Sequence, residues 1–134
     1  VKGLVLIAPA PDFTEKLMWA GFSEEIRTTL ETQGIYLQPS EYDEPYEISH
    51  ALIKDGRHHL LLDGPIELNL PVRILQGMED ADVPWQHALL LAEQLTSTDL
   101  TVSLNKKGDH RLSAPDDLER LTHSLDRLIA LLDG

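Results

Sequence analysis

Short apolar runs recur along the chain and predict the strands of a sheet. The first covers Val1 to Ile7, and its near-continuous hydrophobicity is typical of a strand buried on both faces of a parallel sheet. The second covers Val72 to Leu75 and ends at Gly77. The third, Leu100 to Leu104, alternates apolar and polar residues, which indicates a strand near a sheet edge.

Apolar residues recur at helical spacing after the second and third of these runs. One helix is predicted from Trp85 to Leu95, behind Pro84, and another from Leu118 to Leu132, where Pro115 suits the first turn. Strands that alternate with helices predict parallel pairing with right-handed crossovers. The sequence therefore predicts an α/β fold with three parallel strands and flanking helices.

The segment between the first two strands is too long for a simple crossover. It contains a helix predicted over 23–34, which begins at a serine that can cap it, and a turn-rich stretch over 38–45. A second helix is predicted over 47–62, with Gly56 as its weak point. We expect the whole insertion, about residues 12–66, to be a lid, because long insertions above strand ends often select the substrate.

Composition narrows the possible partners. The chain has 134 residues, of which 42% are hydrophobic, and this length suits one domain. The net charge of −12 argues against nucleic acid as a partner. No apolar run approaches the roughly 20 residues that a membrane-spanning helix needs. The absence of cysteine excludes disulfides and thiolate nucleophiles, and we expect a cytoplasmic location.

The first residues of the chain predict a partner segment. The chain lacks an initial methionine, and its apolar first strand requires a neighbour on each side. We expect the N-terminal half of the same domain to precede it and to carry any targeting segment.

An acidic loop after the second predicted strand is the first candidate for chemistry. Residues 77–85 read GMEDADVPW, and in α/β sheets reactive groups gather at the C-terminal ends of strands. The pattern Gly-x-x-Asp-x-x-Val-Pro resembles the acid loop of α/β-hydrolases, and it identifies Asp80 as the acid. If the motif is matched to the sequence in the wrong register, Asp82 is the acid instead. The sequence departs from many family members at Gln76, where they have histidine.

A histidine loop follows the third predicted strand. Residues 106–111 read KKGDHR. In α/β-hydrolases the triad residues follow one another along the chain as Ser, Asp and His, and the histidine lies in the loop after the last strand, where His110 is found. A carboxylate on one imidazole nitrogen fixes the tautomer, so the other nitrogen can take a proton from serine. We therefore expect Asp80 and His110 to act together, and Asp109 to support the loop.

The nucleophile is not found in the chain. None of its serines lies in the Gly-x-Ser-x-Gly motif, and the oxyanion-hole loop is also missing. The chain thus resembles the C-terminal portion of an α/β-hydrolase, and we expect it to be inactive alone.

A closer resemblance covers nearly the whole chain. Residues 51–62, 65–66, 71–85 and 108–111 are similar to the group of palmitoyl-protein thioesterase and mycophenolic acid acyl-glucuronide esterase, with bacterial carboxylesterase relatives. This resemblance implies a serine hydrolase that acts on an acyl ester or thioester through an acyl-enzyme. It implies neither a metal nor an organic cofactor.

Other residues carry weaker hypotheses. Phe13, Trp19 and Phe22 are candidates for an acyl pocket in the predicted lid. A metal site at His58 and His59 is disfavoured, because adjacent residues on a helix point about 100° apart.

Two other functions remain open from the sequence. The first is a non-catalytic α/β binding module that keeps the sheet for packing. The second is a haloalkane dehalogenase or epoxide hydrolase, in which an aspartate would replace the serine of the missing motif. The residue at the nucleophile position of the missing motif would distinguish the esterase from these two alternatives.

Overall fold

The computed structural model describes residues 1–134 and divides into two compact units. Unit 1 combines Val1–Pro11 with Leu62–Gly134, and unit 2 is the continuous segment Asp12–Leu61. No helix in either unit has the length and apolar character needed to cross a bilayer.

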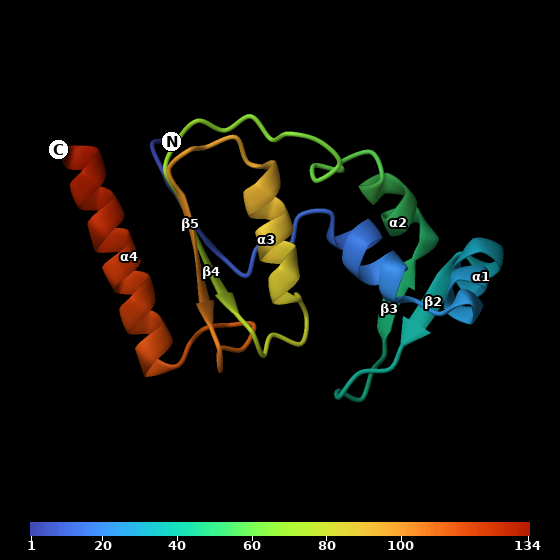
Figure 1. Ribbon diagram of the computed structural model, residues 1–134. Coiled ribbons are helices and arrows are strands. Elements are labelled where there is room, and N and C mark those ends of the chain that lie inside the picture. The colour runs from blue at the N-terminus through green and yellow to red at the C-terminus, as the bar shows by residue number, and fades with distance from the viewer. The chain divides into compact units, whose positions relative to one another are not determined.

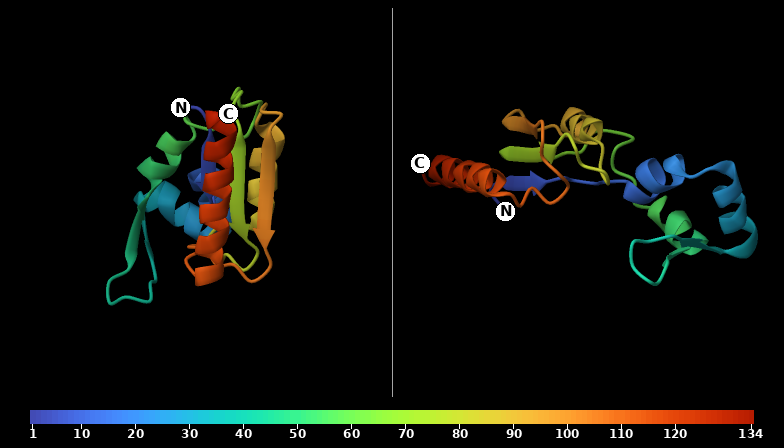
Figure 2. Two further views of the ribbon diagram at one scale, coloured as in Figure 1. Left: turned by 90° about the vertical axis from the view of Figure 1, so that its left-hand side faces the viewer. Right: turned by 90° about the horizontal axis from the view of Figure 1, so that it is seen from below.

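The sheet of unit 1 has three parallel strands in the order β1-β4-β5. These strands are β1 (Leu4–Ile7), β4 (Val72–Gly77) and β5 (Leu100–Asn105), and Figure 2 shows them side by side. The predicted α/β fold is confirmed, and β5 lies at a sheet edge as its alternating pattern indicated. The first strand begins at Leu4, later than predicted.

Two helices cover opposite faces of this sheet, as Figure 1 shows. They are α3 (Trp85–Gln94) and α4 (Pro115–Asp133), the latter with a proline in its first turn as expected. The hydrophobic core lies between α3 and the face of the sheet that α3 covers. Its buried members are Leu62, Val72, Ile74, Ala88, Leu91 and Leu95. Because β4 is the central strand, the loop after its C-terminal end starts from a strand that is hydrogen-bonded on both sides.

Unit 2 contains short helices and a small sheet. A stretch of π-helix, η1 (Phe13–Trp19), precedes α1 (Glu24–Gln33). The predicted cap of α1 is confirmed: Ser23 Oγ accepts the N–H of Ile26 at 3.3 Å. The helix ends at Gly34, whose φ of 81° is a left-handed conformation that glycine adopts without strain.

The second helix predicted in this segment is wrong in its first part. Residues Tyr46–Ser49 form β3, which pairs antiparallel with β2 (Ile35–Gln38). The helix, α2, covers only His50–Gly56. Within this strand Ile48 is buried, and Ser49 then caps α2 by accepting the N–H of Leu52 at 3.1 Å.

Gly56, the expected weak point, is where α2 ends. A Cβ at this position would lie 2.0 Å from Thr14 Oγ1, so the close packing of α2 on η1 requires glycine. The same residue therefore weakens the helix and permits its packing.

Candidate active site

The acidic loop follows the central strand and holds Asp80 in a network of hydrogen bonds. The side chain of Asp80 has no accessible surface. Its Oδ1 accepts the backbone N–H groups of Asp82 and Val83, both at 2.8 Å. Its Oδ2 accepts Nε2–H of Gln76 at 3.0 Å. The carboxylate is thus fixed from both of its oxygens.

His110 meets this carboxylate. Its Nδ1 lies 2.9 Å from Oδ2 of Asp80, and its ring is 44% exposed. Because a carboxylate only accepts hydrogen bonds, this contact places the proton of the neutral ring on Nδ1 and leaves Nε2 as a base. The carboxylate that contacts His110 is that of Asp80 and not that of Asp82.

The two loops are joined through their backbones. Met78 N–H donates to the carbonyl oxygen of Asn105 at 2.8 Å, and Glu79 N–H donates to that of Gly108 at 3.0 Å. Gly77 approaches Gly108 so closely that neither position has room for a side chain next to the other. This contact brings the residues after β4 and β5 within reach of each other.

The histidine loop is held by its own polar groups. Asp109 Oδ1 accepts the N–H of Leu112 at 2.9 Å, and Leu112 has a φ of 48°, in the left-handed region. Asn105 Oδ1 accepts the N–H of Lys107 at 3.3 Å. As expected, Asp109 supports the loop and does not contact Asp80 directly.

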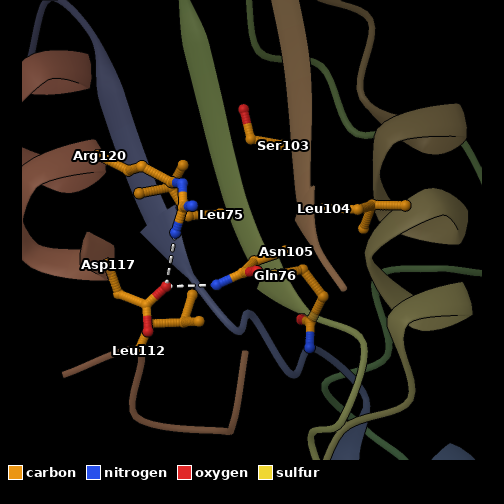
Figure 3. Close-up of a pocket in the computed structure, with 8 residues that line it drawn as sticks. All are labelled: Leu75, Gln76, Ser103, Leu104, Asn105, Leu112, Asp117 and Arg120. Atoms are coloured by element: carbon orange, nitrogen blue, oxygen red, sulfur yellow. Dashed lines mark hydrogen bonds and ion pairs between the residues drawn. The ribbon is translucent and has the colours of Figure 1, made fainter. Parts of the chain in front are cut away.

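A buried carboxylate at the start of α4 supports the same loop, and the sequence reading missed this role. Asp117 is only 7% exposed. Its Oδ1 accepts Nδ2–H of Asn105 at 2.5 Å and a guanidinium N–H of Arg120 at 3.1 Å, as Figure 3 shows. The sequence showed an acidic first turn, which suits any helix start; its link to Asn105 becomes visible only in the fold.

The pKa of the Asp80 carboxyl is lowered from its usual value. Burial alone would raise this pKa, because it disfavours the charged form. Hydrogen-bond donors act in the opposite direction and together outweigh burial. In order of size they are the N–H of Val83, the ring of His110, the N–H of Asp82 and the amide of Gln76. Asp80 is therefore held as a carboxylate.

The oxygens of Asp80 and Asp82 and a ring nitrogen of His110 lie within 4.8 Å of one another, a spacing that a cation could also use. Both oxygens of Asp80 already accept hydrogen bonds, so an ion here would displace the contact with His110. The disfavoured pair His58 and His59 lies just beyond α2, where His59 Nε2 is 3.6 Å from a carboxylate oxygen of Asp55.

The aromatic candidates in unit 2 separate into two groups. Phe13 and Phe22 line an open groove of about 610 Å³. The other lining residues are mostly apolar and come from η1, α1 and the small sheet: Leu17, Met18, Gly21, Ile26, Tyr36, Gln38, Tyr46 and Ile48.

Trp19 does not line this groove. The guanidinium carbons of Arg27 and Arg57 lie 5.4 and 4.9 Å from the centroid of its ring, which also stacks on His50 at 6.2 Å. Arg27 also donates to the carbonyl oxygen of Trp19 at 2.9 Å. These contacts give Trp19 a packing role within unit 2.

Known proteins share this fold. A putative hydrolase from Agrobacterium vitis S4 is 44% identical, with a TM-score of 0.88 over 96% of this chain and 50% of that protein. Alpha/beta hydrolase domain-containing protein 10 from mouse is 36% identical, with a TM-score of 0.87 over 98% of this chain and 53% of that protein. The chain belongs to the α/β-hydrolase superfamily. The family expected from the two loops is thereby confirmed, and the sheet of unit 1 is the C-terminal portion of an α/β-hydrolase sheet.

Curated relatives of this α/β-hydrolase carry a more specific name. The human "palmitoyl-protein thioesterase ABHD10, mitochondrial" is 38% identical over 131 residues, which are 96% of this chain and 42% of that protein. The protein of the same name from Pongo abelii is 39% identical over 107 residues, which are 78% of this chain and 35% of that protein. The chain thus spans less than half the length of these relatives. No family model matches it.

More distant α/β-hydrolases share the fold alone. Est1E from Butyrivibrio proteoclasticus, with ferulic acid bound, is 17% identical and has a TM-score of 0.65 over 97% of this chain. The expected cytoplasmic location is wrong by these comparisons, because the curated relatives are mitochondrial proteins.

Proposed function

We propose that this chain supplies the acid and the base of a Ser-Asp-His triad in a serine hydrolase that cleaves acyl ester or thioester bonds. Asp80 is the acid and His110 is the base. The serine and the oxyanion hole belong to the N-terminal half of the same domain, which this chain does not include. Names of relatives that contain thioesterase and hydrolase support the reaction class.

The contact between Asp80 Oδ2 and His110 Nδ1, at 2.9 Å, carries the proposal. The acid is inaccessible to solvent, whereas the ring is partly exposed, so one nitrogen is anchored while the other can meet a reacting group. A lowered pKa keeps Asp80 negatively charged, and the negative charge stabilises the imidazolium that forms during the reaction.

The chemistry follows from this arrangement. Nε2 of His110 takes the proton from the serine hydroxyl as its oxygen attacks the acyl carbonyl carbon. The imidazolium then gives that proton to the departing alcohol or thiol, and the acyl group stays on the serine. Nε2 then takes a proton from water as the water oxygen attacks the acyl carbon. The bond to serine breaks, the carboxylic acid leaves, and the imidazolium gives its proton to the serine oxygen. Asp80 keeps its charge throughout.

The groove of unit 2 supports an acyl substrate. Its lining is mostly aliphatic and aromatic, and Phe13 and Phe22 each contribute a ring. We assign the acyl chain to this groove and substrate selection to unit 2, in the role of a lid. Trp19 is left out of the substrate-binding set, because its ring is occupied by two guanidinium groups.

A fluorophosphonate probe tests the proposed reaction class. The probe modifies serine only where a base activates it. In the complete protein we expect labelling of one serine outside residues 1–134, and loss of labelling in His110→Ala. The 134-residue chain alone should not be labelled and should not hydrolyse a nitrophenyl ester. Labelling of a serine within this chain would overturn the proposal.

A further inference from the structure

Gln76 is wholly buried beside the proposed catalytic carboxylate. It lies near the end of the central strand, on the face that α3 covers, whereas Leu75 lies on the opposite face beside Arg120 (Figure 3). Its Nε2 has three acceptors within reach: Asp80 Oδ2 at 3.0 Å and the carbonyl oxygens of Gly77 at 3.0 Å and Val83 at 3.2 Å.

These contacts fix which way the amide points. If the amide were turned over, its oxygen would face three other oxygens, and each of these pairs would be repulsive. In the observed orientation Oε1 of Gln76 is buried and has no hydrogen-bond partner. Leaving a buried amide oxygen unpaired costs free energy, so the hydrogen bonds that Nε2 donates must offset this cost.

The amide donates to the same oxygen that holds the base. Oδ1 of Asp80 is bound by two backbone N–H groups, whereas Oδ2 has only Gln76 and His110. The ring of His110 changes charge during the proposed reaction and is partly exposed. Gln76 is therefore the one buried side chain that can hold Oδ2 in place while the ring reacts.

We propose that Gln76 is a positioning residue of the triad. Its N–H, donated to Oδ2, keeps the Asp80 carboxylate oriented toward His110. This inference rests on the proposed function. It requires a hydrogen-bond donor at position 76, so a residue of similar size without a donor cannot replace glutamine, and an acid can replace it only while protonated.

Two substitutions in the complete protein separate positioning from packing. Gln76→Met keeps the length and removes the donor, and we expect kcat to fall by roughly 10- to 100-fold with KM little changed, as for other residues that orient a reacting group. Gln76→Glu restores a donor when its carboxyl is protonated. Burial next to Asp80 raises the pKa of such a group.

The pH profile of Gln76→Glu carries the decisive readout. At each pH the kcat of Gln76→Glu is divided by that of the wild type, because His110 must be neutral to act in both proteins. We expect this ratio to be near one at acidic pH and to fall as the new carboxyl ionises. Other titratable or charged groups around this position are Asp80, Asp82 and His110 on the loops, and Asp117 and Arg120 of α4, which line the same pocket as Gln76. From α3 comes the buried His87, whose Nε2 lies 2.7 Å from the carbonyl oxygen of Pro11. Strands β1 and β5 contribute none.

Gln33→Met, on the exposed end of α1, is the matched control and should leave the kinetics unchanged. Wild-type kcat in Gln76→Met, or a wild-type pH profile in Gln76→Glu, would overturn the inference. So would an equal loss at every pH that follows a lowered melting temperature. If Gln76→Met does not fold, the pH profile of Gln76→Glu decides, because a folding defect would lower its kcat relative to the wild type at every pH and not only where the new carboxyl ionises. Full activity in His110→Ala would instead reject the proposed function.

Discussion

A Cβ built on Gly77 would stand 2.2 Å from the carbonyl oxygen of Gly108. The first glycine ends the strand that leads to Asp80, and the second precedes His110 by two residues. Because the two loops meet at this point, the distance between the proposed acid, Asp80, and the proposed base, His110, depends on the absence of two side chains.

Gly77→Ala should therefore push the two loops apart. The new methyl group would meet backbone atoms, which cannot move aside as a flexible side chain can. We expect a loss of about 1–3 kcal/mol in the free energy of unfolding, as for other overpacked sites, together with a large loss of activity. Urea denaturation and steady-state kinetics measure the two effects. Gly64→Ala is the control, since nothing lies within 4 Å of a Cβ there. Equal behaviour of both variants would contradict the close contact.

The lowered pKa of Asp80 predicts how stability depends on pH. Folding lowers this pKa below its usual value of 3.8, so the folded state binds fewer protons than the unfolded state. The stabilisation is fully present above the usual pKa and is lost as the pH falls through the lowered value. We expect the difference in unfolding free energy between the wild type and Asp80→Asn to be constant above about pH 5 and to shrink as the pH falls through 3.8 and below it. Denaturation followed by circular dichroism measures it, and two parallel curves would show that Asp80 is not stabilised as a carboxylate.

Much of unit 1 could be predicted because its signals are local. The apolar runs marked β4 and β5, and Pro115 with its acidic neighbours marked the start of α4. The order of Asp80 and His110 along the chain allowed their pairing to be expected, since both follow strands of one parallel sheet.

Unit 2 was predicted less well because its small sheet depends on a distant pairing. Ile35 lies opposite Ser49, and nothing in the four residues Tyr46–Ser49 reveals this partner. Their apolar side chains also fit a helix, which is why residues 47–62 were interpreted as one. The same limit applies to Gln76 and Asp117, whose roles arise from contacts made only after folding.

The two groups of aromatic residues in unit 2 should respond differently to substitution. Phe22 lines the groove, where its ring lies 6.1 Å from that of Tyr36, so Phe22→Ala should lower the preference for long over short acyl chains by roughly tenfold. Steady-state kinetics with thioesters of increasing chain length measure this preference.

Trp19→Ala should leave the chain-length preference unchanged. It removes two cation–π contacts worth about 0.5–1 kcal/mol each and should lower the stability of unit 2. An altered chain-length preference in Trp19→Ala, with none in Phe22→Ala, would place the acyl chain outside the groove.

Comparison of three histidine variants in the complete protein tests the central claim most directly. If His110 is the base, His110→Ala should lower kcat/KM for an acyl ester or thioester by roughly 10³-fold or more, whereas His58→Ala and His59→Ala should each change it far less. All three proteins should keep the wild-type melting temperature to within a few degrees, because each ring is exposed. Comparable losses at all three positions, or full activity in His110→Ala, would contradict the account.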